Sequence, residues 1–319
     1  MSLPSSPERR CRTCADERNQ TNPRNTTLDG DDPMGGGATK RLNVLLTGGG
    51  GLVGRRLTPL LTERHNVTHL EMSDPGDGLP SIEGDLRDPE LVAQACQGMD
   101  AIVHVAALHG AAWQAAGDHA LFEINVTGTQ NILEGARVAG VRRVVFTSSI
   151  NATGRTPMPP PYLPIDEDLP REPMDLYGLS KKLGEQLCLY AAQRYGLSII
   201  CLRPGWIAPE DAPLDRQLTK LFHGVDVRDV AQAHALAVDA PFGPGLHLAI
   251  VAADSPLCSV DPLQYFGDPV STLDSFYPGL GQLFAEGTLS LPGQQEWHCI
   301  DRARCLLGYE PQHNFTWPQ

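Results

Sequence analysis

Hydrophobic residues along this chain form two alternating patterns: short continuous apolar runs, and longer stretches in which apolar residues recur every three or four positions. The first pattern is typical of buried parallel strands and the second of amphipathic helices. Strands are therefore predicted at residues 42–47, 67–71, 101–105, 143–148, 198–203 and 246–251. Helices are predicted at residues 52–63, 88–97, 121–139, 177–195 and 300–307. A further helix is expected to open at residues 227–229, with Asp229 as its N-cap.

This alternation also predicts the fold class and the division of the chain. Strands that alternate with helices favour an α/β fold with a doubly wound, mostly parallel sheet. The alternation lapses after Pro204, so we expect residues 41–204 to form the core and residues 205–319 a small C-terminal lobe interleaved with the last core elements. Ligands of such sheets bind at the carboxyl ends of the strands, and the lobe is expected to cover the substrate there.

Composition narrows the classes of partner. Residues 1–40 contain no aromatic residue and little that packs, which predicts a disordered N-terminal extension. They lack the apolar segment of a secretory signal, and no apolar run reaches membrane-spanning length. We therefore expect a cytoplasmic protein without a membrane partner. The 319 residues carry a formal net charge of -13, which argues against a nucleic acid partner.

The cysteines do not indicate a metal site. Cys11 and Cys14 are spaced as CxxC, but no second pair lies at a zinc-binding spacing. Cys96, Cys188 and Cys201 fall within predicted helices or strands and are expected to be small core residues. We expect no bound metal.

A glycine-rich loop follows the first predicted strand, with the sequence TGGGGLVG at residues 47–54. Gly48 permits a tight turn, Gly51 lets the main chain approach a phosphate, and Gly54 lets the next helix lie close to the strand. The free N–H groups and the positive dipole end of that helix then face an anion. Strand, loop and helix in this order predict a pyrophosphate site and hence dinucleotide binding.

A second motif predicts acid–base chemistry. Tyr177 and Lys181 lie four residues apart at the start of a predicted helix, so both side chains point from one face. A free tyrosine has a pKa of about 10, and a neighbouring cation favours the phenolate form that can act as a base. Ser149 ends a predicted strand and is placed to hydrogen-bond a substrate oxygen. The alternative interpretation of Tyr177 and Lys181 is an ordinary surface pair.

Several motifs together resemble the extended short-chain dehydrogenase/reductase family, the NAD-dependent epimerase/dehydratase group. The resemblance covers about residues 42–312, and its motifs are TGGGGLVG at 47–54, GDLRD at 84–88, HVAA at 104–107, NVTGT at 125–129, the serine pair at 148–149, Tyr177 with Lys181, LRP at 202–204 and LGYEP at 307–311. It implies a Rossmann-type fold and an NAD coenzyme.

The resemblance also implies roles for individual residues. The coenzyme loop would use Gly48, Gly51, Leu52, Val53 and Gly54. The adenine would lie against Asp85 and Leu86, and the nicotinamide side would be lined by Val105, Ala106 and Ala107. Lys181 would hold the nicotinamide ribose, while Tyr177 and Ser149 would act on the substrate.

An acidic residue that closes the second strand normally binds the adenosine ribose and selects NAD over NADP in this family. Glu71 is the first candidate and Asp74 the second, although a gapless match places Met72 at this position. No arginine beside it would accept a 2′-phosphate. NAD is therefore expected, with NADP less favoured.

Three polar residues near these motifs receive different expectations. Asn125 is expected to be a structural hydrogen-bonding group on its helix rather than a catalytic one. His104 is expected to end a strand as part of the scaffold, whereas His109 is expected to face the substrate pocket.

The segment between Pro204 and the helix at 227 is short, whereas nucleotide-sugar enzymes usually need far more chain there. This layout is similar to that of uronate dehydrogenases, compact family members that oxidise the anomeric carbon of a hexuronic acid. Arg216 matches the arginine that grips the substrate carboxylate in them, the alternative being a solvated helix residue. Ile150 and Asn151 replace their polar pair after the serine, so only Asn151 is expected to contact substrate and a different sugar or acid stays open.

The leading prediction is an NAD-dependent oxidoreductase that acts on a sugar or sugar-acid hydroxyl. One alternative is a nucleotide-sugar epimerase or dehydratase, in which the hydride returns to the substrate. A second is a non-catalytic NAD-binding regulator. The two long helices at 121–139 and 177–195 suggest a homodimer by analogy with this family.

Overall fold

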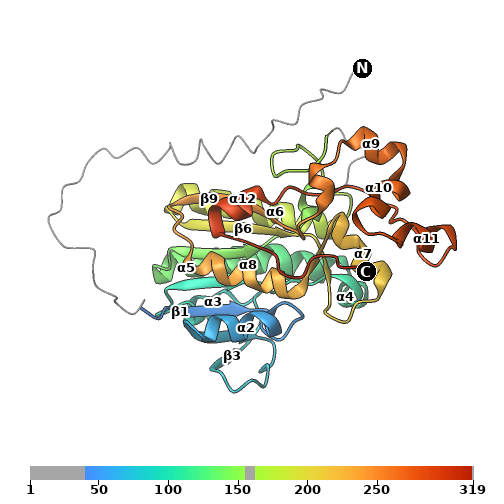
Figure 1. Cartoon of the computed structure of the whole chain (residues 1–319). Coiled ribbons are helices and arrows are strands. Elements are labelled where there is room, and N and C mark those ends of the chain that lie inside the picture. The colour runs from blue at the N-terminus through green and yellow to red at the C-terminus, as the bar shows by residue number, and fades with distance from the viewer. Residues whose placement is uncertain (1–39, 155–161, 318–319) are drawn as a thin grey trace, which may run out of the picture. The chain divides into compact units, whose positions relative to one another are not determined.

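The computed structural model describes residues 40–154 and 162–317, and residues 42–317 contain a seven-stranded parallel sheet with helices on both faces (Figure 1). The strand order is β3-β2-β1-β4-β5-β6-β9, and each neighbouring pair is parallel. The strands are β1 (Asn43–Thr47), β2 (Asn66–Glu71), β3 (Ser81–Glu83), β4 (Ala101–His104), β5 (Arg143–Thr147), β6 (Ser198–Pro204) and β9 (Gly245–Val251). The predicted Rossmann-type α/β fold is confirmed.

Two sets of helices cover the two faces of the sheet. On one face lie α2 (Gly54–Thr62), α8 (Val227–Asp239) and α12 (Asp301–Leu307); on the other lie α3 (Pro89–Ala95), α5 (Gly128–Ala139) and α6 (Leu176–Tyr195). Along β1, Val44 and Leu46 join the core under the first set and Leu45 joins the core under the second. Successive strand residues point to opposite faces, so a continuous apolar run feeds both cores.

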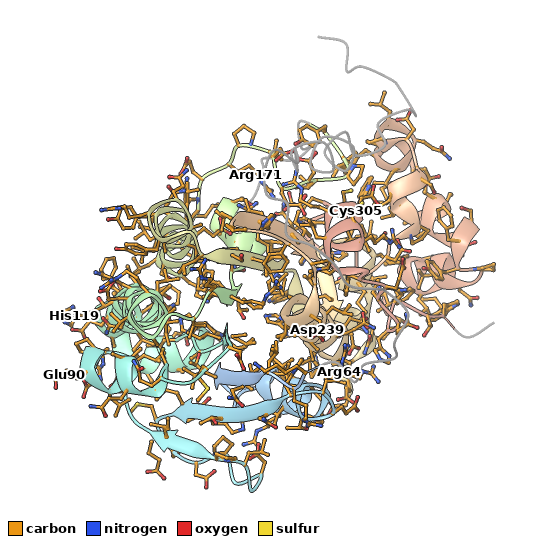
Figure 2. All side chains as sticks on the ribbon, turned by 90° about the vertical axis from the view of Figure 1, so that its left-hand side faces the viewer. Arg64, Glu90, His119, Arg171, Asp239 and Cys305 are labelled. Carbon is orange, nitrogen blue, oxygen red and sulfur yellow. The ribbon has the colours of Figure 1, made fainter. Side chains whose placement is uncertain are left out.

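The helices α2 and α8 lie side by side, and their ends are joined by an ion pair between Arg64 and Asp239 at 3.1 Å (Figure 2). The expectation that Asp229 caps α8 was wrong. The N-cap is Asp226, whose carboxylate accepts the N–H of Arg228, because the chain enters α8 directly from a short strand. Asp229 is buried and accepts main-chain N–H groups of the C-terminal segment instead.

The helix predicted at 121–139 begins earlier than expected. It comprises α4 (Gly110–Phe122), one wide turn (Glu123–Thr127) and then α5. The first part is rich in alanine and lacks an amphipathic stripe, and Gly117 interrupts it with a φ of 84°. Hydrophobic periodicity could therefore not reveal α4.

The chain after β6 builds a third core beside the sheet. Its centre consists of Phe222, Tyr265 and Trp297. The helices α9, α10 and α11, orange and red in Figure 1, lie together and contribute residues to this core. The elements are β7 (Trp206–Ala208), α7 (Leu214–Leu218), a short turn (Thr219–Leu221), β8 (Gly224–Asp226), a second turn (Pro256–Ser259), α9 (Pro262–Gly267), α10 (Pro269–Phe276) and α11 (Leu280–Ala285).

Three expectations concern the remaining sequence features. Cys96, Cys188 and Cys201 are buried in the core, as expected. The predicted extension over residues 1–39, with Cys11 and Cys14, lies outside the described residues. Within the described ranges, no helix combines the length and apolar character needed to cross a bilayer, and no three His, Cys, Asp or Glu side chains are grouped as metal ligands.

Candidate coenzyme and catalytic site

The glycine loop joins β1 to α2 at the carboxyl edge of the sheet. Gly48 has a φ of 80°, and a Cβ atom there would lie 2.6 Å from the Ala106 nitrogen. A Cβ on Gly54 would lie 2.1 Å from the carbonyl oxygen of Gly48, so only glycine lets α2 start this close to the strand. Gly51 donates its N–H to the same oxygen at 3.1 Å. Leu52 is 54% exposed and Val53, the first residue before α2, caps no N–H group with its side chain.

Glu71 is the last residue of β2 and lies against this loop. Its carboxylate accepts the N–H of Gly49. Burial raises the pKa of Glu71, and hydrogen bonds from the loop act in the opposite direction. Met72, the alternative from a gapless match, is 71% exposed, and Asp74 instead accepts the N–H of Gly76 in a turn. Of the three candidates, Glu71 is the one in contact with the loop.

The loop after β4 packs directly on the glycine loop. The N–H groups of Val105 and Ala106 donate to the Thr47 carbonyl oxygen at 3.1 and 3.2 Å, and Ala107 follows them, half-buried. His104 bridges the Thr47 and Thr129 hydroxyls, and burial lowers its pKa to about 3. A neutral, fully bonded ring of this kind fits the scaffold role expected of His104.

Asp85 and Leu86 lie where β3 ends. Asp85 forms an ion pair with Arg87 at 2.6 Å, and this hydrogen bond lowers the pKa of the carboxyl group. Leu86 is buried, and its carbonyl oxygen accepts the Asn131 amide at 2.8 Å. Hydrogen bonds with Arg87 and Asn131 thus fix the positions of Asp85 and Leu86.

Ser149, Tyr177 and Lys181 converge at the end of β5. Tyr177 occupies the first turn of α6, whose N-cap Asp175 accepts the Gly178 N–H at 2.6 Å. The Lys181 ammonium donates to the carbonyl oxygen of Thr147 at 2.7 Å and lies 5.9 Å from the centre of the Tyr177 ring. The Ser149 side chain hydrogen-bonds the Tyr177 hydroxyl. Lys181 is only 3% exposed, which excludes the alternative interpretation of Tyr177 and Lys181 as an ordinary surface pair.

Burial dominates the charge state of this trio. It raises the pKa of Tyr177 to about 12, while the hydrogen bond with Ser149 acts to lower it. It lowers the pKa of Lys181 to about 8. The net pKa of Tyr177 therefore lies above its usual value and that of Lys181 below it, because burial disfavours the charged form of each group. The lowering of the tyrosine pKa by Lys181 stays a prediction.

A buried ion pair fixes the strand ends around the trio. The Arg203 guanidinium at the end of β6 binds the Glu185 carboxylate of α6 through two contacts of 2.8 Å. The Ser148 hydroxyl donates to the same carboxylate at 2.6 Å. A buried, doubly hydrogen-bonded ion pair of this kind fixes the relative positions of its two elements but adds little to the free energy of unfolding. The pair holds α6, with Tyr177 and Lys181, against β5 and β6.

Asn125 ties three elements together below the site. Its amide accepts the Leu108 N–H at 2.7 Å and donates to the Leu108 carbonyl and the Ser180 hydroxyl. Asn125 is buried, and these bonds fit the structural role expected of it. The loop it holds carries His109, whose ring centre lies 6.0 Å from that of Tyr177. Partial desolvation, followed by the charge of Lys181, lowers the pKa of His109.

The two remaining substrate candidates lie after β5 and β6. Asn151 is half-buried in the turn Ile150–Thr153, and its N–H donates to the Ser149 hydroxyl at 3.1 Å. Arg216 lies exposed on α7, with its guanidinium carbon 4.9 Å from the ring centre of Trp206. Sequence reasoning missed Trp206. The available signal was a large aromatic residue directly after the strand that ends in Arg203 and Pro204.

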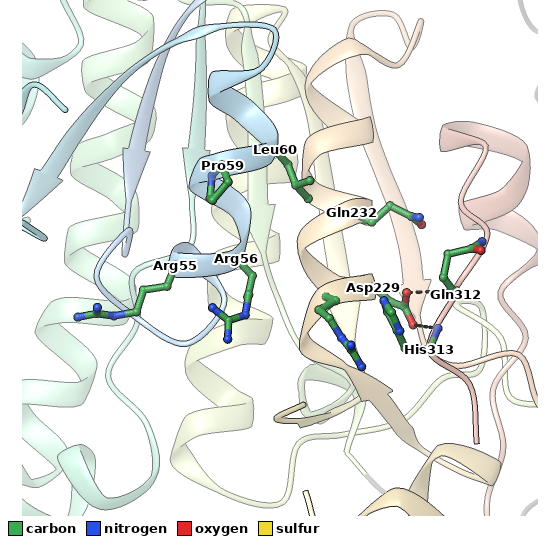
Figure 3. Close-up of a pocket in the computed structure, with 9 residues that line it drawn as sticks. Arg55, Arg56, Pro59, Leu60, Asp229, Gln232, Gln312 and His313 are labelled. Atoms are coloured by element: carbon green, nitrogen blue, oxygen red, sulfur yellow. Dashed lines mark hydrogen bonds between the residues drawn. The ribbon is translucent and has the colours of Figure 1, made fainter. Parts of the chain in front are cut away.

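A separate pocket of 410 Å³ opens between α2 and α8 (Figure 3). It is lined by Arg55, Arg56, Pro59, Leu60, Arg228, Asp229, Gln232, Gln312 and His313. Ser149, Tyr177 and Lys181 do not line it. Glu210, in the segment before α7, pairs with Arg56 and approaches Arg228 at 3.9 Å. This carboxylate ties the segment that carries Arg216 to the helix that starts in the glycine loop.

The residues present fit an NAD coenzyme. In the turn before α2, the N–H groups of Leu52 and Val53 donate to no other group within the described residues and so are available to a pyrophosphate. The Glu71 carboxylate suits a ribose hydroxyl and repels a 2′-phosphate. The buried Lys181 ammonium lies at the same edge of the sheet, beside the loop after β4. This donor set suits a dinucleotide.

Comparison with known proteins finds relatives of this chain among sugar dehydrogenases. L-arabinose 1-dehydrogenase (NAD(P)(+)) of Haloferax volcanii is 34% identical over 181 residues, which cover 53% of this chain and 68% of that protein. Uronate dehydrogenase of Pseudomonas syringae is 31% identical over 190 residues, which cover 57% of this chain and 65% of that protein. The chain thus spans about two thirds of the length of these curated relatives.

The solved structure of a mutated uronate dehydrogenase has 25% sequence identity and a TM-score of 0.63, over 85% of this chain and 82% of that one. The sequence model of the NAD dependent epimerase/dehydratase family matches residues 44–223, which is more than half of the chain. That range includes the glycine loop, Glu71 and the Ser149, Tyr177 and Lys181 trio. The predicted family and its NAD coenzyme are confirmed: the chain belongs to the NAD dependent epimerase/dehydratase family.

Proposed function

We propose that this protein is an NAD-dependent oxidoreductase that oxidises a hydroxyl group of a sugar or sugar acid. The observation that carries the proposal is the convergence of Ser149, Tyr177 and Lys181 at the end of β5, beside the loop after β4 that packs on the glycine loop. A base, a hydroxyl-orienting group and a cation at a coenzyme site are the parts that hydroxyl oxidation requires.

In this proposal each group has one task. Tyr177 takes the proton of the substrate hydroxyl, and Ser149, already bonded to the Tyr177 oxygen, orients the substrate oxygen. Lys181 holds the nicotinamide ribose and supplies positive charge beside the phenol. NAD, when bound, supplies the acceptor for the hydride of the same carbon. The substrate loses two electrons and two hydrogens and becomes a carbonyl compound.

The substrate class is argued from the segment between β6 and α8. It runs only from 205 to 226, which leaves little chain to hold a nucleoside diphosphate. In this proposal Arg216, on the same segment, binds a substrate carboxylate. His109 lies beside Tyr177, and Asn151 is hydrogen-bonded to Ser149, which supports substrate contacts of both residues. Relatives named as arabinose and uronate dehydrogenases support a free sugar or sugar acid.

The direct test is an assay with NAD and a panel of D-glucuronate, D-galacturonate and L-arabinose. We expect the absorbance band of reduced nicotinamide to grow with at least one of them. The same assay with Glu71→Gln tests the coenzyme choice, because loss of the charge at this position should narrow the preference for NAD over NADP. Glu83→Gln, at the end of the neighbouring strand β3, is the matched control.

The second candidate is a nucleotide-sugar epimerase or dehydratase, which the family description includes. In that chemistry the hydride returns to the substrate, so no reduced coenzyme accumulates. Silence with every free sugar, together with conversion of UDP-glucose or UDP-N-acetylglucosamine, would replace the first candidate by the second. A non-catalytic regulator would convert none of them.

The homodimer also remains a proposal. On α5 and α6, Val138 and Tyr190 are 55% and 57% exposed, and burying such side chains in a four-helix contact would stabilise a dimer. Light scattering on the purified chain would show twice the monomer mass. The cytoplasmic location stays a prediction from the sequence.

A further inference from the structure

Trp206 is an exposed aromatic residue at the functional edge of the sheet. Its side chain is 52% exposed, whereas Trp297 in the third core is fully buried. An indole left in water forgoes the hydrophobic stabilisation that burial of such a large ring provides. The exposed indole therefore raises the free energy of the unliganded protein, and a ligand that covers the ring would recover this hydrophobic stabilisation.

The main chain brings Trp206 to the same edge of the sheet as Ser149. In the register of β5 and β6, Thr147 pairs with Leu202, and the Ser148 N–H donates to the Leu202 carbonyl oxygen at 2.7 Å. Ser149 and Trp206 therefore leave adjacent strands at the same carboxyl edge. The parallel arrangement of these strands brings the residues that follow them to one side of the sheet.

The direction of the chain at Trp206 is fixed by close packing. A Cβ on Gly205 would lie 2.3 Å from the His223 carbonyl oxygen, so the chain passes His223 without room for a side chain. The Trp206 N–H donates to that same oxygen at 2.7 Å, as β7 pairs with β8. The ring thus projects from a rigid main chain, which suits a group that must hold a ligand in one orientation.

Two side chains flank the indole. The Arg216 guanidinium carbon lies 4.9 Å from its centre, and the His223 ring lies 5.7 Å away with an interplanar angle of 33°. Across residues 40–154 and 162–317, the Arg216 guanidinium has this stacking contact and no ion pair. An arginine that rests on an aromatic ring without a carboxylate partner is preorganised to receive an anion.

We propose, building on the proposed function, that Trp206 determines substrate specificity by forming the wall against which a cyclic monosaccharide stacks. One face of a sugar ring presents C–H groups and is apolar, so it packs on an indole while its hydroxyls stay hydrogen-bonded. Arg216 at the side of the same wall takes an acidic substituent of that ring. The substrate class is a ring-form sugar acid of monosaccharide size.

Kinetics of Trp206→Ser and Trp206→Phe test the wall, with Trp113→Phe as the matched control. Trp113 lies on α4, and its indole N–H donates to Asp118. Trp206→Ser should raise KM for D-glucuronate by about tenfold, the size of a lost aromatic contact, and leave KM for NAD unchanged. Trp206→Phe should restore most of the affinity. An unchanged sugar KM in Trp206→Ser would overturn the proposal.

Binding is measured separately from turnover in a Tyr177→Phe background. D-glucuronate added to this variant with NAD should quench the indole fluorescence, and the quenching should disappear when Trp206→Phe is added but persist when Trp113→Phe is added. If the fluorescence is still quenched in the Trp206→Phe variant, the proposal that Trp206 stacks against the sugar is wrong. If the wild type oxidises sugars and the Trp206 variants behave like it, only this inference fails; if no sugar is oxidised or bound, the proposed function fails with it.

Discussion

The loop proposed to hold the coenzyme is fixed by main-chain packing, whereas the segment proposed to contact the substrate presents exposed side chains. A Cβ on Gly54 would lie 2.1 Å from the Gly48 oxygen, which leaves no freedom at the coenzyme loop. On the segment at 205–226, Trp206 and Arg216 are exposed and rest on each other. Members of a family that share one coenzyme need a binding loop of one fixed shape, whereas their choice of substrate can change through a few exposed side chains.

The ion pairs of the two regions differ in the same way. Glu185 and Arg203, which hold α6 with Tyr177 and Lys181 in place, are each only 7% exposed and meet through two contacts. The pair of Arg56 with Glu210, which ties the substrate segment to α2, has side chains 50% and 35% exposed. Water screens the second pair, so it contributes little stability and leaves the segment adjustable.

The largest expected effect on turnover comes from Tyr177, which is proposed to act on the substrate beside the coenzyme. Tyr177→Phe removes the proposed base and should lower kcat by about 10³-fold or more, with NAD affinity retained, because no coenzyme contact of the glycine loop is altered. Tyr190→Phe, on the same helix but exposed, is the control and should behave as wild type. Turnover by Tyr177→Phe near the wild-type rate would remove Tyr177 from the mechanism.

Lys181→Met should change how stability depends on pH. Burial lowers the folded-state pKa of Lys181 from 10.5 to about 8, so between these values the unfolded chain binds a proton that the folded chain does not. Stability of the wild type relative to Lys181→Met should therefore rise by about 3 kcal/mol as pH increases from below 8 to above 10.5. Denaturant melts at several pH values measure this difference. A parallel pH dependence in both proteins would show that the ammonium is not desolvated.

Gly54→Ala tests the rigid coenzyme side. The added methyl group collides with main-chain atoms and should lower the free energy of unfolding by about 2 kcal/mol. KM for NAD should rise while KM for the sugar changes less. Gly50→Ala is the matched control, since a Cβ there meets nothing within 4 Å and stability should stay at the wild-type level.

Arg216→Gln tests the adjustable substrate side. It should raise KM for D-glucuronate by about tenfold through loss of one charge-assisted contact, and leave KM for L-arabinose and NAD unchanged. Steady-state kinetics with both sugars give the comparison directly. Equal losses with the acidic and the neutral sugar would mean that Arg216 supports the segment and does not bind a carboxylate.

Glu210→Gln should give the smallest effect. The exposed pair with Arg56 is worth at most about 1 kcal/mol, so thermal stability should change by no more than this amount and KM for sugar should shift by less than about fivefold. The shift should shrink at high salt, which screens the pair. Glu134→Gln, which breaks a surface pair with Arg137 on α5, is the control for loss of a surface charge.

The sequence predicted the sheet well because buried parallel strands leave a clear apolar run. The strands at 43–47, 66–71, 101–104 and 143–147 agree with the predicted ranges to within one residue at each end. The three-residue edge strand β3 and the helix α4 were missed, since neither carries a sufficient hydrophobic period. The prediction that Asp229 caps α8 failed because a local pattern cannot show that its carboxylate accepts N–H groups of the distant residues Gln312 and His313.

The sequence by itself determined the family and the coenzyme and predicted the Ser149, Tyr177 and Lys181 trio, because these depend on local motifs of fixed spacing. Only the tertiary structure decided their charge states and the surroundings of the substrate segment. Burial, which raises the pKa of Tyr177 to about 12 and lowers that of Lys181 to about 8, arises from atoms distant in sequence. The contact of Trp206 with Arg216 likewise depends on how strand ends meet in space, which no single segment encodes.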